Sequence, residues 1–114
     1  MGSVTELLEN QERRERQRLL DEKQEVESVL EDRKRIYNDV KAELDEEIRV
    51  QGEMLESAAG SSDNDREARI RNRLRELYQE RREELRSYWR NCESWVEWKL
   101  ELERQLDELE QVRE

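Results

Sequence analysis

The sequence contains no proline and only three glycines among its 114 residues. Proline in a helix interior costs about 3 kcal/mol and glycine about 1 kcal/mol relative to alanine, so the usual helix breakers are scarce. Hydrophobic residues make up 32% of the chain, aromatic residues 5%, and phenylalanine is absent. Such a composition does not favour a thick globular core. We therefore expect an all-α protein of elongated shape.

The sequence also lacks histidine and glycine-rich phosphate-binding loops, and its one cysteine is Cys92. Without a neighbouring histidine or cationic pocket, the thiol has no group that would activate it as a nucleophile. In acidic runs such as residues 44–47, adjacent carboxylates point to different sides of a helix. This favours solvated charge over a metal site. The sequence predicts no enzymatic activity, no metal, no cofactor and no small-molecule substrate.

No long apolar run and no secretory signal pattern is present. A lone cysteine also excludes an intrachain disulfide, a bond typical of secreted domains. The sequence therefore predicts an intracellular protein that does not bind membranes, with cytoplasm and nucleus equally open.

Charged residues are the largest class in the sequence and make up 47% of it. Lys and Arg number 22 against 32 Asp and Glu, which gives a formal net charge of −10. The two signs are interspersed, a pattern typical of solvated helix faces rather than of a disordered acidic tail.

The expected helix boundaries come from capping signals. Ser3 followed by Glu6 resembles a capping box, in which the Ser hydroxyl accepts from the amide three residues on. Small and cap-forming residues interrupt the charged pattern at 57–65, and Asn64 followed by Glu67 gives a second start signal. We expect one elongated domain, a fragment of a larger protein, with these segments: a first long helix over 3–57, a turn over 58–64 and a second long helix over 65–114.

Both predicted helices have an apolar stripe. The stripe of the second helix follows a heptad pattern: Ile70, Leu74, Leu77, Arg81, Glu84, Tyr88, Asn91, Trp95, Trp98, Leu102, Gln105, Leu109 and Val112. The first helix fits a spacing of eleven residues at least as well, in four rows: Leu8, Leu19 and Leu30; Val26, Tyr37 and Ile48; Val29 and Val40; Leu44 and Leu55.

A short turn between two such helices predicts an antiparallel coiled-coil hairpin. With the turn centred near Gly60, the facing pairs are expected to be Leu44 with Leu77, Val26 with Trp95, and Leu19 with Leu102.

The run YWRNCESWVEW, residues 88–98, holds most of the aromatic side chains and suggests a second apolar row beside the stripe. One neighbouring helix cannot cover both rows, so the second row is expected to face another molecule. Leu106 and Leu109 add to it, because the register sets them opposite the wholly polar residues 9–18. The predicted partner-binding residues are Leu85, Trp89, Cys92, Val96, Leu100, Leu106 and Leu109.

These residues predict a protein interaction and assembly module, a scaffold subunit that presents an apolar helix face to a second copy or to a partner helix. Two hairpins joined into a four-helix assembly would cover both rows at once. The alternative is that aromatic side chains at helical spacing only flank a wide intrachain seam.

A function of another class is a helical rod that binds nucleic acid. Arginines outnumber glutamates between residues 66 and 90, with aromatic side chains among them. The arginines that would contact phosphates are Arg66, Arg69, Arg71, Arg75, Arg82 and Arg86. A solvated helix face is the preferred interpretation of these residues, because a net charge of −10 opposes a polyanion at long range.

Overall fold

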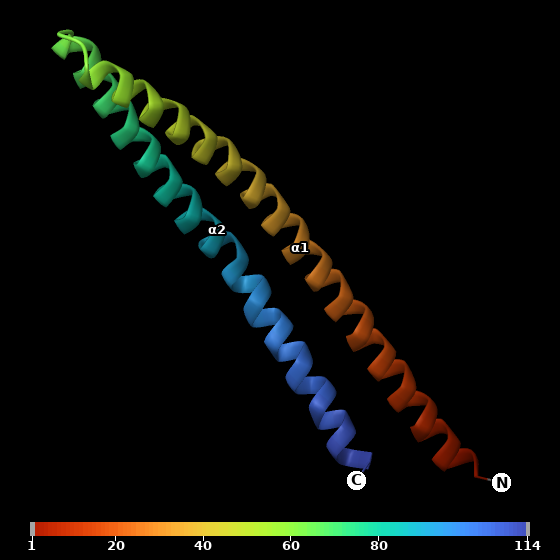
Figure 1. The fold of residues 1–114 in the computed structure, drawn as a ribbon. Helices are drawn as coiled ribbons and strands as arrows, with labels where there is room; N and C mark the ends of the chain where they lie inside the picture. The colour runs from red at the N-terminus through yellow and green to blue at the C-terminus, as the bar shows by residue number, and fades with distance from the viewer. Residues whose placement is uncertain (1, 114) are drawn as a thin grey trace. The chain divides into compact units, whose positions relative to one another are not determined.

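The computed structural model describes residues 2–113, except the side chains of Val112 and Arg113. Two helices, α1 (Ser3–Ala59) and α2 (Asn64–Arg113), account for nearly all of these residues (Figure 1). No strand occurs in the described part of the chain. The predicted fold class, all-α with two long helices in a hairpin, is therefore confirmed. Val112, the last residue of the predicted stripe, falls outside the described side chains.

The start of α1 differs from the predicted capping box. The amide of Glu6 donates to the backbone carbonyl of Gly2 at 2.8 Å, so Ser3 lies within the first turn instead of capping it. The carbonyl of Gly2 therefore accepts the first helical hydrogen bond. At its other end, α1 continues through Ala59, beyond Ser57, because alanine is the strongest helix former.

The turn between the helices is closed by serine and aspartate. The amide and the hydroxyl of Ser61 both donate to the carbonyl of Ala58, at 3.0 and 2.9 Å. Asp63 caps α2, because its carboxylate accepts from the amide of Arg66 at 3.1 Å. The cap is therefore Asp63 and not the predicted Asn64, which is the first residue of α2.

The chain divides into two units, and each contains a part of both helices. The unit of Arg33–Arg90 contains the turn and the paired helix segments beside it. Asp45 and Arg81 form an ion pair across these antiparallel segments, with Oδ1 and Nη1 3.0 Å apart. Leu77 is fully buried here, and its predicted partner Leu44 is half-buried.

The second unit joins Met1–Asp32 to Asn91–Glu114. Its core is a cluster of three buried side chains, Leu19, Val26 and Leu102. Trp95 packs against this cluster, so both pairs predicted for this region, Leu19 with Leu102 and Val26 with Trp95, lie in one core. Further side chains that pack on the cluster are Leu30, Leu106 and Leu109.

Ion pairs between the helices flank the core of this unit. Lys23 Nζ lies 3.6 Å from a carboxylate oxygen of Glu103, and Lys99 Nζ lies 3.8 Å from one of Glu27. From the first pair to the second, the residue number rises from 23 to 27 in α1 and falls from 103 to 99 in α2. The two segments therefore run antiparallel. Each pair is partly exposed and contributes at most about 1 kcal/mol, which leaves the apolar cluster as the main source of stability.

Burial along α2 corrects the predicted heptad register. Cys92 is 4% exposed, whereas the predicted core residue Asn91 is exposed. Likewise Lys99 is half-buried, whereas Trp98 is 43% exposed. The inward positions of α2 recur every eleven residues in two rows: Ile70, Arg81 and Cys92; Leu77, Tyr88 and Lys99.

One predicted heptad row stays inward along α2: Leu74, Arg81, Tyr88, Trp95, Leu102 and Leu109. The other row shifts by one residue, from Asn91 to Cys92 and from Trp98 to Lys99, as a spacing of eleven residues requires. In α1 the predicted row Val26, Tyr37 and Ile48 is buried or half-buried. Leu8 is the exception among the predicted rows, since its side chain is exposed.

Candidate protein-binding surface

Four of the seven predicted partner-binding residues are exposed on α2. Trp89 has 65% of its surface exposed and is the most exposed aromatic residue. Leu85 belongs to the same unit and is also exposed, while Val96 and Leu100 are exposed in the unit that contains residues 91–114. Contiguous exposed apolar patches mark partner-binding surfaces, whereas single exposed apolar side chains are common.

Cys92 was assigned to the outward row, and this prediction is wrong. Its thiol is free and buried, so the side chain belongs to the covered side of α2. The eleven-residue spacing explains the difference, because Cys92 continues the inward row of Ile70 and Arg81.

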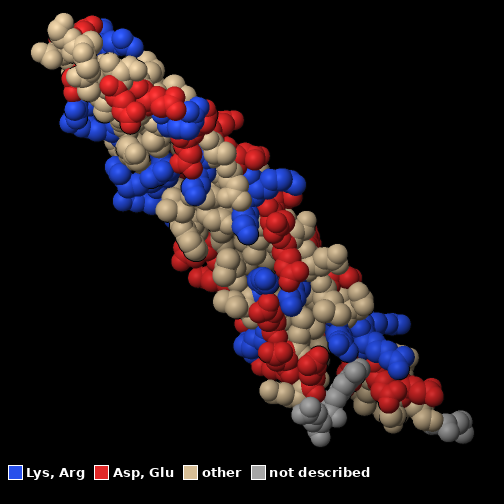
Figure 2. Space-filling model, in the orientation of Figure 1, with Lys and Arg blue, Asp and Glu red and all other residues tan. Residues whose placement is uncertain are grey.

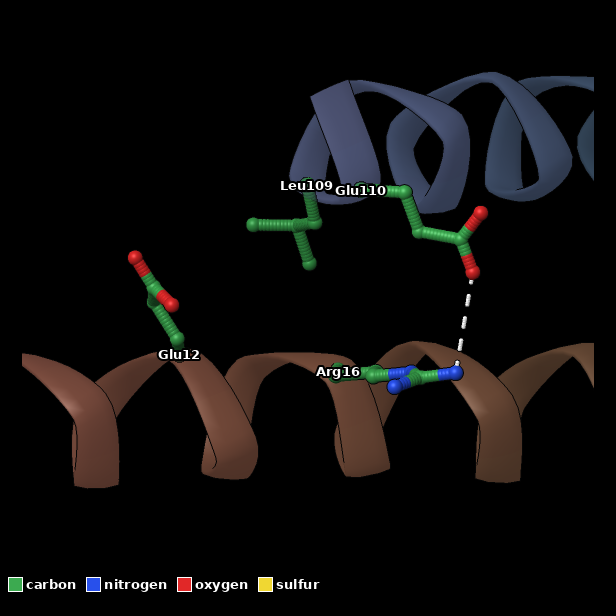
Figure 3. A pocket seen from close by; sticks show the side chains of 4 residues that line it. All are labelled: Glu12, Arg16, Leu109 and Glu110. Atoms are coloured by element: carbon green, nitrogen blue, oxygen red, sulfur yellow. Dashed lines mark ion pairs between the residues drawn. The ribbon is translucent and has the colours of Figure 1, made fainter. Parts of the chain in front are cut away.

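Leu106 and Leu109 were expected to need a partner chain, and the structure places them otherwise. Both are half-buried and pack against the core cluster of their own chain. Leu109 lines a small pocket together with Glu12, Arg16 and Glu110 (Figure 3). Arg16 Nη2 lies 3.6 Å from Glu110 Oε1 across this pocket.

Figure 3 shows Leu109 opposite the α1 backbone between Glu12 and Arg16. The polar segment of α1 therefore covers Leu109 with the aliphatic stems of long charged side chains, as such stems commonly do. A second chain is not required to cover Leu106 and Leu109.

The six arginines of the alternative nucleic-acid site do not share one face. Helical spacing sets four of them on the same side of α2 as Leu85 and Trp89: Arg71, Arg75, Arg82 and Arg86. Arg66 and Arg69 project from other sides of the helix. The two surfaces predicted separately from the sequence therefore overlap in the unit of residues 33–90.

Intrachain partners occupy only some of these four arginines. Arg71 Nη2 lies 2.8 Å from Glu67 Oε1, and Arg75 donates to the side-chain carbonyl of Asn72 at 3.4 Å. Arg82 and Arg86 have no ion pair with any residue that the structure describes. Their guanidinium groups are thus available to an external anion.

The net charge is unequally divided between the two units. Residues 33–90 hold 14 basic and 14 acidic side chains, so this unit is formally neutral. The other unit holds 8 basic and 18 acidic side chains and accounts for the whole net charge of −10. Both signs are intermixed over the face drawn in Figure 2. The arginine-rich part of α2 therefore lies outside the acidic unit.

Three arginines elsewhere on the surface, Arg18, Arg49 and Arg104, are neutralised within the chain. Arg104 lies between Glu101 and Glu108, one turn away on each side, and pairs with both. Hydrogen bonds from Arg104 and then from Gln105 lower the pKa of Glu101 from its ordinary value to about 2. Arg18 and Arg49 are bracketed by glutamates in the same way. Such pairs stabilise the helix locally and are not binding groups.

Two exposed aromatic residues were not predicted as part of a surface. Tyr78 lies on the same side of α2 as Trp89, and its ring centroid is 5.1 Å from the guanidinium carbon of Arg81. Trp98 is exposed on another side, although the heptad register placed it in the seam. The spacing of eleven relates Tyr78 to the exposed Trp89. It does not predict the exposure of Trp98, because Leu109, eleven residues later, packs on the core.

The described part of the chain offers neither a metal site nor a membrane-spanning helix. No group of Cys, Asp and Glu in residues 2–113 could hold a metal ion. Neither helix has, over its described length, an apolar stretch long enough to span a membrane.

No curated protein and no solved structure matches this chain. One family model does match, and it covers residues 2–113, which is almost the whole sequence and both helices. The protein therefore belongs to the family of unknown function DUF8104.

Proposed function

We propose that the chain is a protein–protein interaction and assembly module, a scaffold subunit of an intracellular complex. Its binding residues are the exposed apolar side chains of α2: Leu85, Trp89, Val96 and Leu100. Trp89 carries the proposal, because it is the most exposed aromatic residue, with 65% of its surface exposed, whereas tryptophan is on average highly buried in proteins. Tryptophan is also among the residues whose loss most often weakens an interface, by about 2 kcal/mol or more.

The chemistry of the rest of the surface supports this proposal. Most other exposed positions are charged, and several pair with neighbours one turn away. The exposed large apolar side chains of α1 are aliphatic: Val4, Leu7, Leu8, Leu20, Ile36 and Val50. The local surroundings of Trp89 also favour a rigid anchor. Its ring meets Tyr88 edge-on, with centroids 6.2 Å apart, and Tyr88 is itself stacked on Tyr37. A side chain held in this way loses little entropy on binding.

Trp89→Glu tests the proposal, with Trp98→Glu as a matched control. Both tryptophans are exposed, both lie in α2, and the substitution changes size and charge equally. The complex that contains the tagged chain is recovered from its own cells under native conditions and its mass is measured. We expect Trp89→Glu to reduce this mass and Trp98→Glu to preserve it. If the complexes recovered with the native chain and with the Trp89→Glu chain have equal masses, this surface has no assembly role.

Nucleic-acid binding remains the second candidate. The observation in its favour is the side of α2 that combines Arg71, Arg75, Arg82 and Arg86 with exposed aromatic rings, outside the acidic unit. Aromatic rings stack on bases while arginines contact phosphates. The acidic unit, with its excess charge of −10, opposes such binding.

Titration of the chain with a labelled single-stranded oligonucleotide at several salt concentrations separates the two candidates. Four phosphate contacts predict that the logarithm of the binding constant falls with the logarithm of the salt concentration with a slope of about −3. Apolar association, in contrast, changes little with salt. Absence of binding at low salt would remove the nucleic-acid candidate.

A further inference from the structure

Two consecutive stretches of α2 carry the same surface pattern with opposite charge. The first is the basic strip, Arg82, Leu85, Arg86 and Trp89, and the second is the acidic strip, Glu93, Val96, Glu97 and Leu100. Each residue of the acidic strip follows its counterpart by eleven residues, which is three turns of helix. Within each strip the spacing is three, one and three, so the four side chains share one face.

All eight side chains are exposed, although the strips belong to different units of the chain. The apolar members are Leu85 and Trp89 in the basic strip and Val96 and Leu100 in the acidic strip. None of the four charged members, Arg82, Arg86, Glu93 and Glu97, has an ion pair with a residue that the structure describes. Both strips therefore present apolar side chains together with charge that the chain itself leaves uncompensated.

This arrangement differs from that of the arginines that are paired on both sides. Arg18, Arg49 and Arg104 each pair with glutamates one turn before and one turn after. Arg82 and Arg86 are instead like charges four residues apart, and so are Glu93 and Glu97. Like charges at this spacing repel on an isolated helix. An opposite strip on another molecule would offset both repulsions with attractions across the interface.

We propose that the basic strip of one copy binds the acidic strip of a second copy, an inference that rests on the proposed assembly function. The chain supplies both surfaces in equal length, with charges of opposite sign around apolar side chains of similar exposure. Charge complementarity of this kind selects the partner, while the apolar contacts supply most of the affinity. A nucleic acid would neutralise the basic strip but would be repelled by the acidic strip.

Charge reversal tests the pairing in the purified full-length chain by sedimentation velocity. Arg82→Glu with Arg86→Glu makes both strips acidic, and Glu93→Arg with Glu97→Arg makes both strips basic. We expect each of these variants to self-associate at least about tenfold more weakly than the native chain. An equimolar mixture of the two should associate again, because each strip then meets its opposite. The chain that carries all four reversals should also self-associate.

Arg66→Glu with Arg69→Glu is the matched control, since both arginines are exposed, lie on other sides of α2 and undergo the same change of charge. This variant should associate like the native chain. Circular dichroism establishes that every variant keeps its helices, and the restored association of the mixture excludes misfolding as the cause.

A native chain that sediments as a monomer up to high micromolar concentration would overturn the second-copy pairing. A mixture of the two variants that fails to associate would also overturn it. The assembly function itself fails only if Trp89→Glu leaves the mass of the cellular complex unchanged. Loss of oligonucleotide binding in the Arg82→Glu, Arg86→Glu variant, together with a monomeric native chain, would assign the basic strip to nucleic acid instead.

Discussion

The rings of Tyr37 and Tyr88 stack across the two helices, with centroids 4.6 Å apart and planes inclined by 17°. The two tyrosines belong to the unit of residues 33–90. Arg81, seven residues before Tyr88, is an inward position of the same unit and is only half-buried. Stacked aromatic rings contribute beyond the area that they bury. The two tyrosines are therefore expected to be energetically coupled.

A double-mutant cycle with Tyr37→Ala and Tyr88→Ala measures this coupling. We expect an interaction energy of about 0.5–1.5 kcal/mol in the free energy of unfolding by urea. Tyr78→Ala is the control, because Tyr78 is exposed. Its effect on the free energy of unfolding should add to that of Tyr37→Ala. Additive losses for Tyr37 and Tyr88 would show that the stack contributes nothing specific.

Leu102 and Leu100 lie two residues apart in α2 and are predicted to differ strongly in their effect on stability. Leu102 is fully buried in the core cluster, so Leu102→Ala should cost about 2–5 kcal/mol of unfolding free energy. Leu100 is exposed, and Leu100→Ala should change the stability of the dilute chain by less than about 0.5 kcal/mol. Urea denaturation at low protein concentration checks both values. Similar losses for the two variants would contradict the observed register of α2.

Glu101 is predicted to stay ionised in acid. Its pKa in the folded chain is about 2, below the ordinary value of 4.5, because Arg104 and Gln105 donate hydrogen bonds to its carboxylate. A lowered pKa in the folded state means that the stabilisation is present above pH 4.5 and is lost as the pH falls through about 2. A carboxyl-carbon NMR titration should show this pKa directly.

Arg104→Ala should raise the pKa of Glu101 toward its ordinary value, since the largest cause of the shift is removed. Arg18→Ala removes an equivalent arginine, which forms ion pairs with Glu15 and Glu22, and should leave the Glu101 titration unchanged. A midpoint for Glu101 that does not move in Arg104→Ala would contradict the hydrogen bonds.

Two glycines are predicted to tolerate alanine, for different reasons. Gly52 lies inside α1, and a Cβ there would meet no atom within 4 Å, so Gly52→Ala should raise stability by about 0.5–1 kcal/mol. Gly60 follows α1, yet its φ is not positive and the added Cβ would lie 3.9 Å from the carbonyl oxygen of Ser57. Gly60→Ala should therefore change stability by less than about 0.5 kcal/mol. Thermal unfolding compares the two, and a large loss in Gly60→Ala would indicate a left-handed residue at the turn.

The sequence alone determined the two helices and the place of the turn. No proline interrupts either helix, and the small residues after Ser57 are a strong local signal, because chain propensity acts over a few neighbouring residues. The core pairs Leu19 with Leu102 and Val26 with Trp95 followed from the position of the turn. The apolar character of the exposed surface at Leu85 and Trp89 was also evident from the sequence.

Only the tertiary structure decided which of two adjacent residues faces the partner helix. The pairs of neighbours that decide the register are Asn91 with Cys92 and Trp98 with Lys99. A heptad and an eleven-residue repeat differ at these positions by only a small rotation of the helix. Packing against α1 selects the orientation of α2 within each unit, because it buries Leu77 and Ile70 in one unit and Leu102 in the other. That orientation buries Cys92 and exposes Trp98, and it brings Leu106 and Leu109 onto the core of their own chain.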